Sequence, residues 1–243
     1  MALWCYKCEL GLFCRRSRMD CKNIVLEIIS ILVSAVATLA AAYFGAKFAF
    51  DFQNRKNAEN ADLAMVKGAN LAIFELMRLH HNLTAIQKQH IEPELSNEGR
   101  HFSILPSTSQ ISHLNINFSD LAFLLSSSDP NFLNELALTQ SEINATIDLI
   151  NARSNFHFAE FQPLLQLHQA ALGELTSVRK MEEIVGVRAT QMLRGLTDTM
   201  IRDVPSALSI LSKDVGTLHR LTKTIYPKHS VVRMEFTHVR TET

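Results

Sequence analysis

The chain has 243 residues, of which 47% are apolar, with 24 basic and 24 acidic side chains and a formal net charge of zero. This charge balance argues against a general nucleic-acid-binding protein, which usually carries a basic excess, so no nucleic-acid partner is predicted. With only 8 Gly and 6 Pro, the chain has few turn-forming residues, which favours long helices over a β-sandwich.

The N-terminal segment, residues 1–23, holds all the cysteines of the chain: Cys5, Cys8, Cys14 and Cys21. Four thiolates are a candidate zinc site, but structural zinc sites usually space the second pair as tightly as the first, and here six residues separate it. Lipid-modified or incidental cysteines are the alternative, and no cofactor is predicted. Translation from Met19 would remove three of the four.

Residues 24–52 are predicted to form one transmembrane helix. From Ile28 to Ala46 the chain runs for nineteen residues without a charge, which is roughly 28 Å of helix and matches the hydrocarbon core of a bilayer. A buried core helix rarely stays apolar on every face, and a cleaved signal peptide has a shorter apolar run. We therefore expect a single-pass membrane protein in contact with lipid.

Basic residues beside this helix bear on its orientation. Counted from Met1, five precede it and four follow it, which decides nothing under the positive-inside rule. Counted from Met19, Lys22 alone precedes it. That second count predicts a C-terminal domain in the cytoplasm, below an inner (plasma) membrane.

Small side chains recur every fourth position in the predicted span. Such a face lets two helix backbones approach closely, so it is a candidate packing face for a homo-oligomer or for partner helices, although alanine is also simply common in membrane anchors. The face comprises Ser30, Ser34, Thr38 and Ala42, and beside them Ala37, Ala41 and Gly45.

The remaining residues, 53–243, are predicted to form an all-α bundle of about four soluble helices. The transmembrane helix continues without proline to about Glu92-Pro93, and a heptad seam with alternating steps of four and three marks its buried face. Ile73 and Phe74 are expected to widen that face. The seam comprises Met65, Ala69, Ala72, Leu76, Leu79, Leu83, Ile86 and His90.

The later helices are predicted from similar seams and from turn residues. A loop with a short helix at 109–114 and another short helix at 118–125 precede a helix that starts at Ser128-Asp129-Pro130 and ends near Arg153. Pro163 is expected to open a helix to Leu175, and a last helix spans 181–224 with a kink near Arg202, caused by Pro205. Residues 230–236 alternate weakly and predict an extended segment docked on the bundle. An up-down bundle is the simplest packing.

The main chemical signal of the soluble part is Arg153 with His157. One helical turn apart, the two can face the same way, so that one stabilises a phosphate and the other moves a proton. The pair resembles the arginine-to-histidine motif of HEPN-type ribonucleases, which has four to six intervening residues where this chain has three. The alternative is a helix C-terminus capped by basic side chains.

The run from Ala41 to Gln53, together with Leu196-Thr-Asp198 and Tyr226-Pro-Lys228, resembles uncharacterised bacterial inner-membrane proteins with one N-terminal anchor and a cytoplasmic helical domain. The resemblance implies a topology and no activity. We expect a membrane-anchored helical scaffold or interaction protein, self-associating and without evident catalysis. The alternative is a membrane-associated effector of the bacterial defence type, either HEPN-like or pore-forming.

Overall fold

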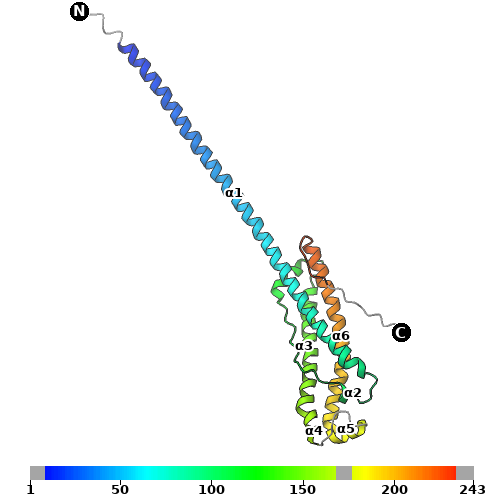
Figure 1. Ribbon diagram of the computed structural model, residues 1–243. Helices are drawn as coiled ribbons and strands as arrows, with labels where there is room; N and C mark the ends of the chain where they lie inside the picture. The colour runs from blue at the N-terminus through cyan, green and yellow to red at the C-terminus, as the bar shows by residue number, and fades with distance from the viewer. Residues whose placement is uncertain (1–8, 168–176, 234–243) are drawn as a thin grey trace, which may run out of the picture. The chain divides into compact units, whose positions relative to one another are not determined.

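The computed structural model describes residues 9–167 and 177–233, and the surroundings of side chains from residue 23 on. Every regular element in these ranges is helical, which confirms the all-α prediction. The chain divides into two compact units, residues 1–60 and residues 61–243. The helix α1 (Glu9–Ile86) contributes residues to both (Figure 1).

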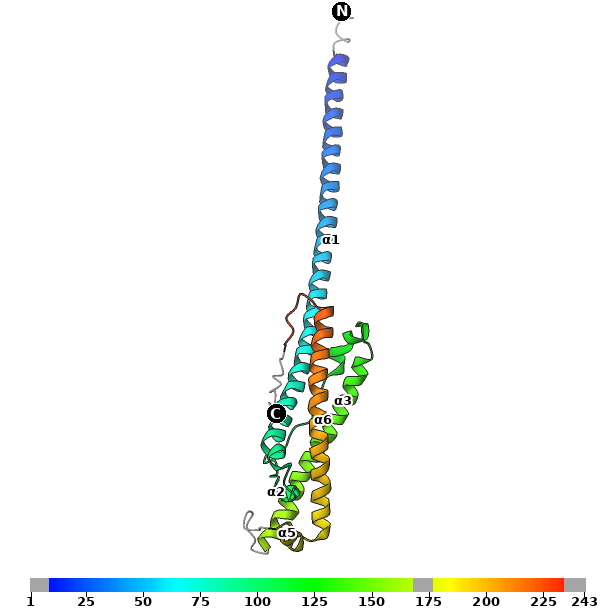
Figure 2. The same cartoon turned by 90° about the vertical axis from the view of Figure 1, so that its right-hand side faces the viewer.

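The second unit is built on three helical runs, namely the later part of α1, the run that starts with α3 (Phe132–Phe156), and α6 (Val187–Ile225). The α1, α3 and α6 runs lie side by side (Figures 1 and 2), and their inward seams share one apolar core. In α1, Leu76, Leu79 and Leu83 are fully buried, as the heptad predicts. Ile73, predicted to widen the buried face, is also buried. Phe74, predicted to do the same, is exposed, and that part of the prediction is wrong.

Two wide helical turns occupy the same position relative to a proline. The π-turns η1 (Gln87–Ile91) and η4 (His157–Phe161) each end two residues before Pro93 or Pro163. A proline ring crowds the carbonyl four residues earlier and offers no N–H to it, and a wider turn relieves that contact. The chain therefore continues from α3 through η4 into α4 (Gln162–Leu167). The predicted break after Arg153 is wrong.

Shorter elements connect these runs. The 3₁₀ turn η2 (Glu92–Glu94) follows η1, and α2 (Arg100–Ser103) and the 3₁₀ helix η3 (Phe118–Ser126) precede α3. Gly68 is the glycine of α1 that lies in the second unit, and a side chain at this position would collide with Asp120 of η3.

The last predicted helix is divided in two. Gly186 ends α5 (Val178–Val185) and precedes α6, with φ of 84°, a conformation that glycine adopts without strain. Residues 168–176 lie outside the described ranges, so the predicted end of a helix at Leu175 lies outside them too. Beyond Gly186, α6 runs unbroken through Pro205.

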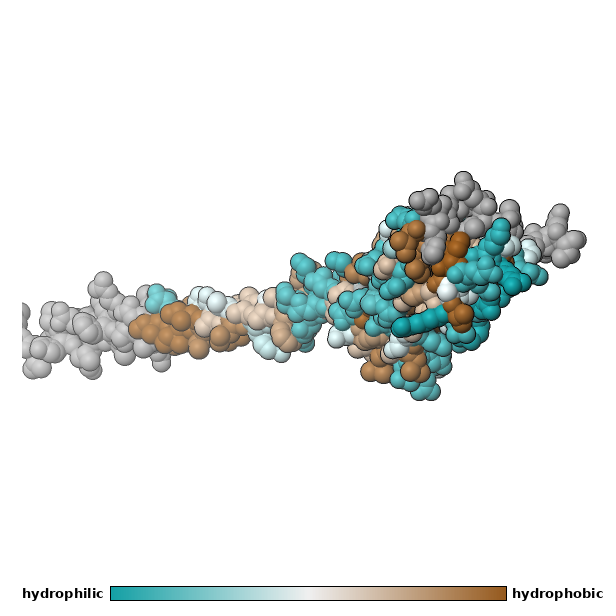
Figure 3. Space-filling model, turned by 90° about the horizontal axis from the view of Figure 1, so that it is seen from below, coloured by the Kyte–Doolittle hydropathy of each residue, from teal (hydrophilic) through white to brown (hydrophobic). Residues whose placement is uncertain are grey.

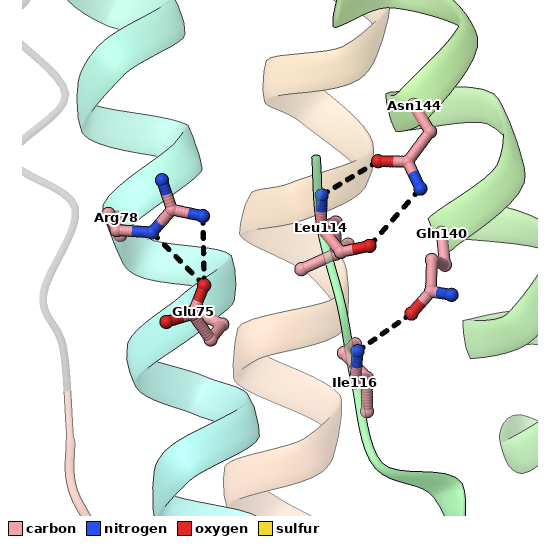
Figure 4. A network of polar contacts seen from close by, with 6 residues as sticks. All are labelled: Glu75, Arg78, Leu114, Ile116, Gln140 and Asn144. Carbon is pink, nitrogen blue, oxygen red and sulfur yellow. Dashed lines mark hydrogen bonds and ion pairs between the residues drawn. The ribbon is translucent and has the colours of Figure 1, made fainter. Parts of the chain in front are cut away.

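The segment between α2 and η3 differs most from prediction, because residues 109–114 form no helix. This extended segment, residues 107–117, is here called the strap. Figure 4 shows it between α1 and α3, where carboxamides of α3 bind its backbone. Asn144 accepts from the N–H of Leu114 at 2.7 Å and donates to its carbonyl at 3.1 Å. Asn151 binds Ile111 in the same two-sided way, and Gln140 accepts from the N–H of Ile116.

The C-terminal segment is docked by a similar clamp. The Asn70 side chain of α1 donates to the carbonyl of Ser230 at 3.3 Å and accepts from the N–H of Val232 at 2.9 Å. Val231, between them, packs on the main core. The predicted docked segment is thus confirmed for residues 230–233, and its last three residues lie outside the described ranges.

Candidate functional site

Arg153 lies inside the bundle, at the joint of α2, α3 and α6. Its side chain is 1% exposed. Nε donates to Oγ1 of Thr197 on α6 at 2.8 Å, and Nη2 donates to the carbonyl of Ile104 at 2.7 Å and to that of His101 at 3.4 Å. These carbonyls end the short helix α2, so the guanidinium caps α2 while it ties α3 to α6.

The charge of Arg153 is balanced by dipoles. Within the described ranges no carboxylate lies at ion-pair distance from it. Burial lowers the pKa of Arg153 to about 10, so the guanidinium still carries its charge at neutral pH. A buried cation of this kind is tolerated only when its hydrogen bonds are made, as they are here.

His157 follows one turn later, at the start of η4. Its side chain is 0% exposed, and neither Nδ1 nor Nε2 has a hydrogen-bond partner among the described residues. The ring centroid lies 4.7 Å from that of Phe161. Burial, aided by the charge of Arg153, lowers the pKa of His157 to about 4, so the imidazole is neutral at physiological pH.

The surroundings of this pair are apolar and aromatic. Phe102 stacks on Phe161 with centroids 5.6 Å apart, and His101 lies against Phe102 at 4.0 Å. Phe102 and Phe161 belong to a second core cluster with Leu165 and Leu193. Burial, with the nearby charge of Arg194, lowers the pKa of His101 as well.

The geometry of Arg153 and His157 supports a structural role. A catalytic pair must contact a phosphodiester. Both side chains are buried, and Arg153 already donates hydrogen bonds to Thr197 and to two backbone carbonyls. The pair that resembles the HEPN motif therefore lies in a part of the bundle that a substrate does not reach.

Asp214 of α6 is a further buried ionisable group. It is 2% exposed and its Oδ2 has no hydrogen-bond partner among the described residues. Burial raises the pKa of Asp214, and a hydrogen bond from the hydroxyl of Thr139 on α3 opposes that shift. Its burial and its contact with Thr139 make Asp214 part of the packing between α3 and α6 as well.

The candidate packing face of the first unit lies open. Its residues, Ser30, Ser34, Thr38 and Ala42 with Ala37, Ala41 and Gly45, are all exposed. The hydroxyl of Thr38 is satisfied within the helix by the carbonyl of Ser34 at 2.8 Å, and a Cβ at Gly45 would meet nothing. The Thr38 hydroxyl therefore needs no partner from a neighbouring helix that packs on this face.

The apolar residues around this face are exposed as well. Within the described part of the chain, one helix is long and apolar enough to cross a membrane, and its most apolar stretch has no buried residue. In the space-filling view this stretch is coloured brown to pale beige, with some white (Figure 3). Side chains such as Ile31 and Leu39 are 68% and 71% exposed.

The zinc site considered for the cysteines lies outside the residues whose side chains the structure describes. Cys5 and Cys8 lie outside them, and Cys14 and Cys21 fall in α1 at positions whose side-chain surroundings are not described. From residue 23 on, no group of three His, Cys, Asp or Glu residues within the described ranges could hold a metal ion.

Sequence reasoning missed the residues that bind the strap. Gln140, Asn144 and Asn151 share one face of α3, since they stand at positions i, i+4 and i+11. Three carboxamides in that register are a usable signal, because a carboxamide can accept from the N–H and donate to the carbonyl of one residue of a non-helical chain.

Comparison of the sequence with protein-family models and curated proteins, and of the fold with solved structures, gave no match.

Proposed function

We propose that the protein is a membrane-anchored helical scaffold or interaction protein, in which the apolar stretch of α1 crosses the membrane once and the bundle serves as the soluble interaction domain. The observation that carries this proposal is the unburied apolar stretch. An exposed apolar surface of this extent is unfavourable in water, whereas a helix in lipid satisfies its own backbone and buries such side chains. Counted from Met19, Lys22 alone precedes the stretch while Lys47, Arg55, Lys56 and Lys67 follow it, and this count favours a cytoplasmic bundle under an inner membrane.

Two carboxylates in the apolar stretch are expected to abolish membrane insertion. Each charged residue near the centre of a transmembrane helix costs about 2.5–3.5 kcal/mol, so Val36→Asp with Leu39→Asp should move most of the protein into the soluble or aggregated fraction. Sodium carbonate extraction of cell membranes measures this.

The matched control replaces two exposed leucines of the second unit, Leu63→Asp with Leu71→Asp. This variant should stay in the membrane pellet, like the unaltered protein. Release of the unaltered protein by carbonate, or equal behaviour of both variants, would contradict the anchor.

We further propose that the small-residue face of α1 joins copies of the chain within the membrane. Gly45→Leu places a bulky side chain on that face, where nothing in the described chain opposes it, so a loss of association reports on a helix from another copy. Sedimentation of the protein in a nonionic detergent should show at least a tenfold weaker association, about 1.4 kcal/mol.

Ala40→Leu is the matched control for Gly45→Leu. It adds a similar bulk to an exposed position about 140° around the helix. Its association should equal that of the unaltered chain. A monomer at all concentrations, or equal effects of both variants, would remove the self-association proposal and leave the anchor standing.

The alternative of a membrane effector, HEPN-like or pore-forming, stays a prediction. The enclosed positions of Arg153 and His157 offer its ribonuclease form no accessible catalytic pair. Its pore-forming form would use the same face of α1, so it shares the test with Gly45→Leu.

A further inference from the structure

A groove runs along the outer side of α3 and α6. Its first hollow has a volume of about 330 Å³. From α3 it is lined by Glu142, Ala145 and Leu149, and from α6 by Asp203, Ser206 and Ile210. Small and apolar side chains form its floor, and a carboxylate stands on each helix.

A second hollow, of about 430 Å³, continues the same line. Its lining includes Phe156 and Glu160 from the α3 run and Ala189 and Met192 from α6. The lining residues named above recur along each helix at spacings of three, four, seven and eleven residues, so each set lies on one helix face. From Glu142 of the first hollow to Phe156 of the second is about 21 Å along α3, the length of a helix of four turns.

Exposed apolar side chains border the groove. Leu138, one turn before Glu142 on the same face of α3, is 63% exposed, and Met192 is 50% exposed. Two parallel seams with heptad spacing, and no helix of residues 9–167 or 177–233 between them, offer what a fourth helix of a bundle would contact. The shape of the groove therefore suits an amphipathic helix whose anchors recur at i, i+3, i+4 and i+7.

The charges of the groove indicate the kind of helix. Three carboxylates, Glu142, Asp203 and Glu160, line the two hollows against one guanidinium, Arg188. Arg202 pairs with Asp203 at 2.8 Å on an exposed edge, where such a pair contributes little and is readily exchanged. A second copy of this face would bring carboxylates against carboxylates, whereas lysines or arginines flanking an apolar stripe would complement them.

We propose that this groove is the docking site for a cationic amphipathic helix of a partner protein, in about the place of a fourth bundle helix. The inference rests on the proposed function, because it names the surface and the partner class of the interaction domain. Apolar anchors occupy the two hollows, and basic side chains pair with Glu142, Asp203 and Glu160.

A designed peptide tests the proposal. The probe is an 18-residue helix with a leucine stripe flanked by lysines and a fluorescent label, titrated against the full chain held in an uncharged amphipol and corrected for binding to empty amphipol. Saturable binding in fluorescence anisotropy is expected. A peptide of equal composition with its leucines dispersed, or with glutamate for lysine, should bind at least tenfold more weakly.

Charge-reversed variants assign the binding to the groove. Glu142→Lys with Asp203→Lys should weaken the peptide at least tenfold, about 1.4 kcal/mol. Glu98→Lys with Asp62→Lys makes the same change of net charge at exposed positions outside the groove, and should leave the affinity within about twofold. Circular dichroism checks that both variants fold.

Three results would overturn the proposal. These are the absence of saturable binding, equal affinity for both charge-reversed variants, and a photo-crosslinker at Leu138 that joins two copies of the chain in place of the peptide. None of them depends on membrane insertion, so the anchor can hold in carbonate extraction while the docking site fails, and the reverse.

Discussion

Replacing Arg153 with methionine is expected to lower the free energy of unfolding of the bundle by about 3–5 kcal/mol, a large share of the 5–15 kcal/mol typical of a domain. Methionine keeps much of the apolar stem but leaves the hydroxyl of Thr197 and the carbonyls of Ile104 and His101 without their donor. Each unpaired buried group costs about 1–3 kcal/mol. Urea unfolding of the full chain in a nonionic detergent, followed by circular dichroism, measures the loss.

Arg188→Met is the control, because Arg188 is exposed on α6 and surface substitutions usually change stability by about 0.5 kcal/mol or less. Arg153→Lys should fall between the two, since one ammonium group reaches fewer of the three acceptors. A loss below about 1 kcal/mol for Arg153→Met would contradict the structural role and reopen a functional one.

Replacing His157 with phenylalanine is expected to remove a large part of the acid sensitivity of the fold. Unfolded, this histidine titrates near its ordinary pKa of 6.5, while in the bundle burial and Arg153 lower that pKa to about 4. As the pH falls from 6.5 toward 4, the unfolded chain takes up a proton that the folded chain refuses. The stability present above pH 6.5 is therefore lost over this range, by about 2–3 kcal/mol.

Unfolding curves at pH 7.5 and pH 4.5 give the test. At pH 7.5, His157→Phe should be as stable as the unaltered chain or more stable. The reason is that the ring nitrogens of His157 make no hydrogen bond in the described structure, so the substitution removes none. It should then lose less stability at pH 4.5. His81→Phe, at an exposed position of α1, should keep the full acid sensitivity. Parallel pH profiles for His157→Phe and the unaltered chain would show that His157 is accessible to protons in the fold.

The seams of the long helices were predictable from the sequence because one buried face at helical spacing leaves a direct periodic trace. Leu76, Leu79 and Leu83 on α1 are buried as predicted, and Leu211, Val215 and Leu218 on α6 are buried at the same spacing of three and four. The strap was not predictable in this way. The local sequence of residues 109–114 does not determine their conformation. Hydrogen bonds to Asn144 and Asn151, thirty to forty positions further along the chain, determine it instead.

The breaks were harder to predict than the helices. Pro163 resembles a helix start, and a helix can begin there, yet the wide turn η4 lets the preceding helix pass through to it. Gly186, by contrast, divides a helix predicted to be continuous. Its positive φ distinguishes it from a glycine tolerated inside a helix, and the sequence does not show that angle.

The candidate pair shows the same limit for function. The spacing of Arg153 and His157 correctly predicts that they are neighbours on one helix face. Whether that face contacts solvent or α6 depends on tertiary packing. Arg153 binds Thr197 of α6, which lies forty-four positions later in the chain. Spacing alone therefore does not distinguish a catalytic pair from a structural one.

The clamps of α3 determine which substitutions the strap can accept. Since Asn144, Asn151 and Gln140 bind peptide groups, they select a backbone path and leave the identity of outward side chains such as Ser112 and Asn115 open. Proline is the exception at Ile111, Leu114 and Ile116, where the N–H is in use. The outward side chains of the strap can thus be substituted, or can carry an attached label, while the backbone keeps its path along the bundle.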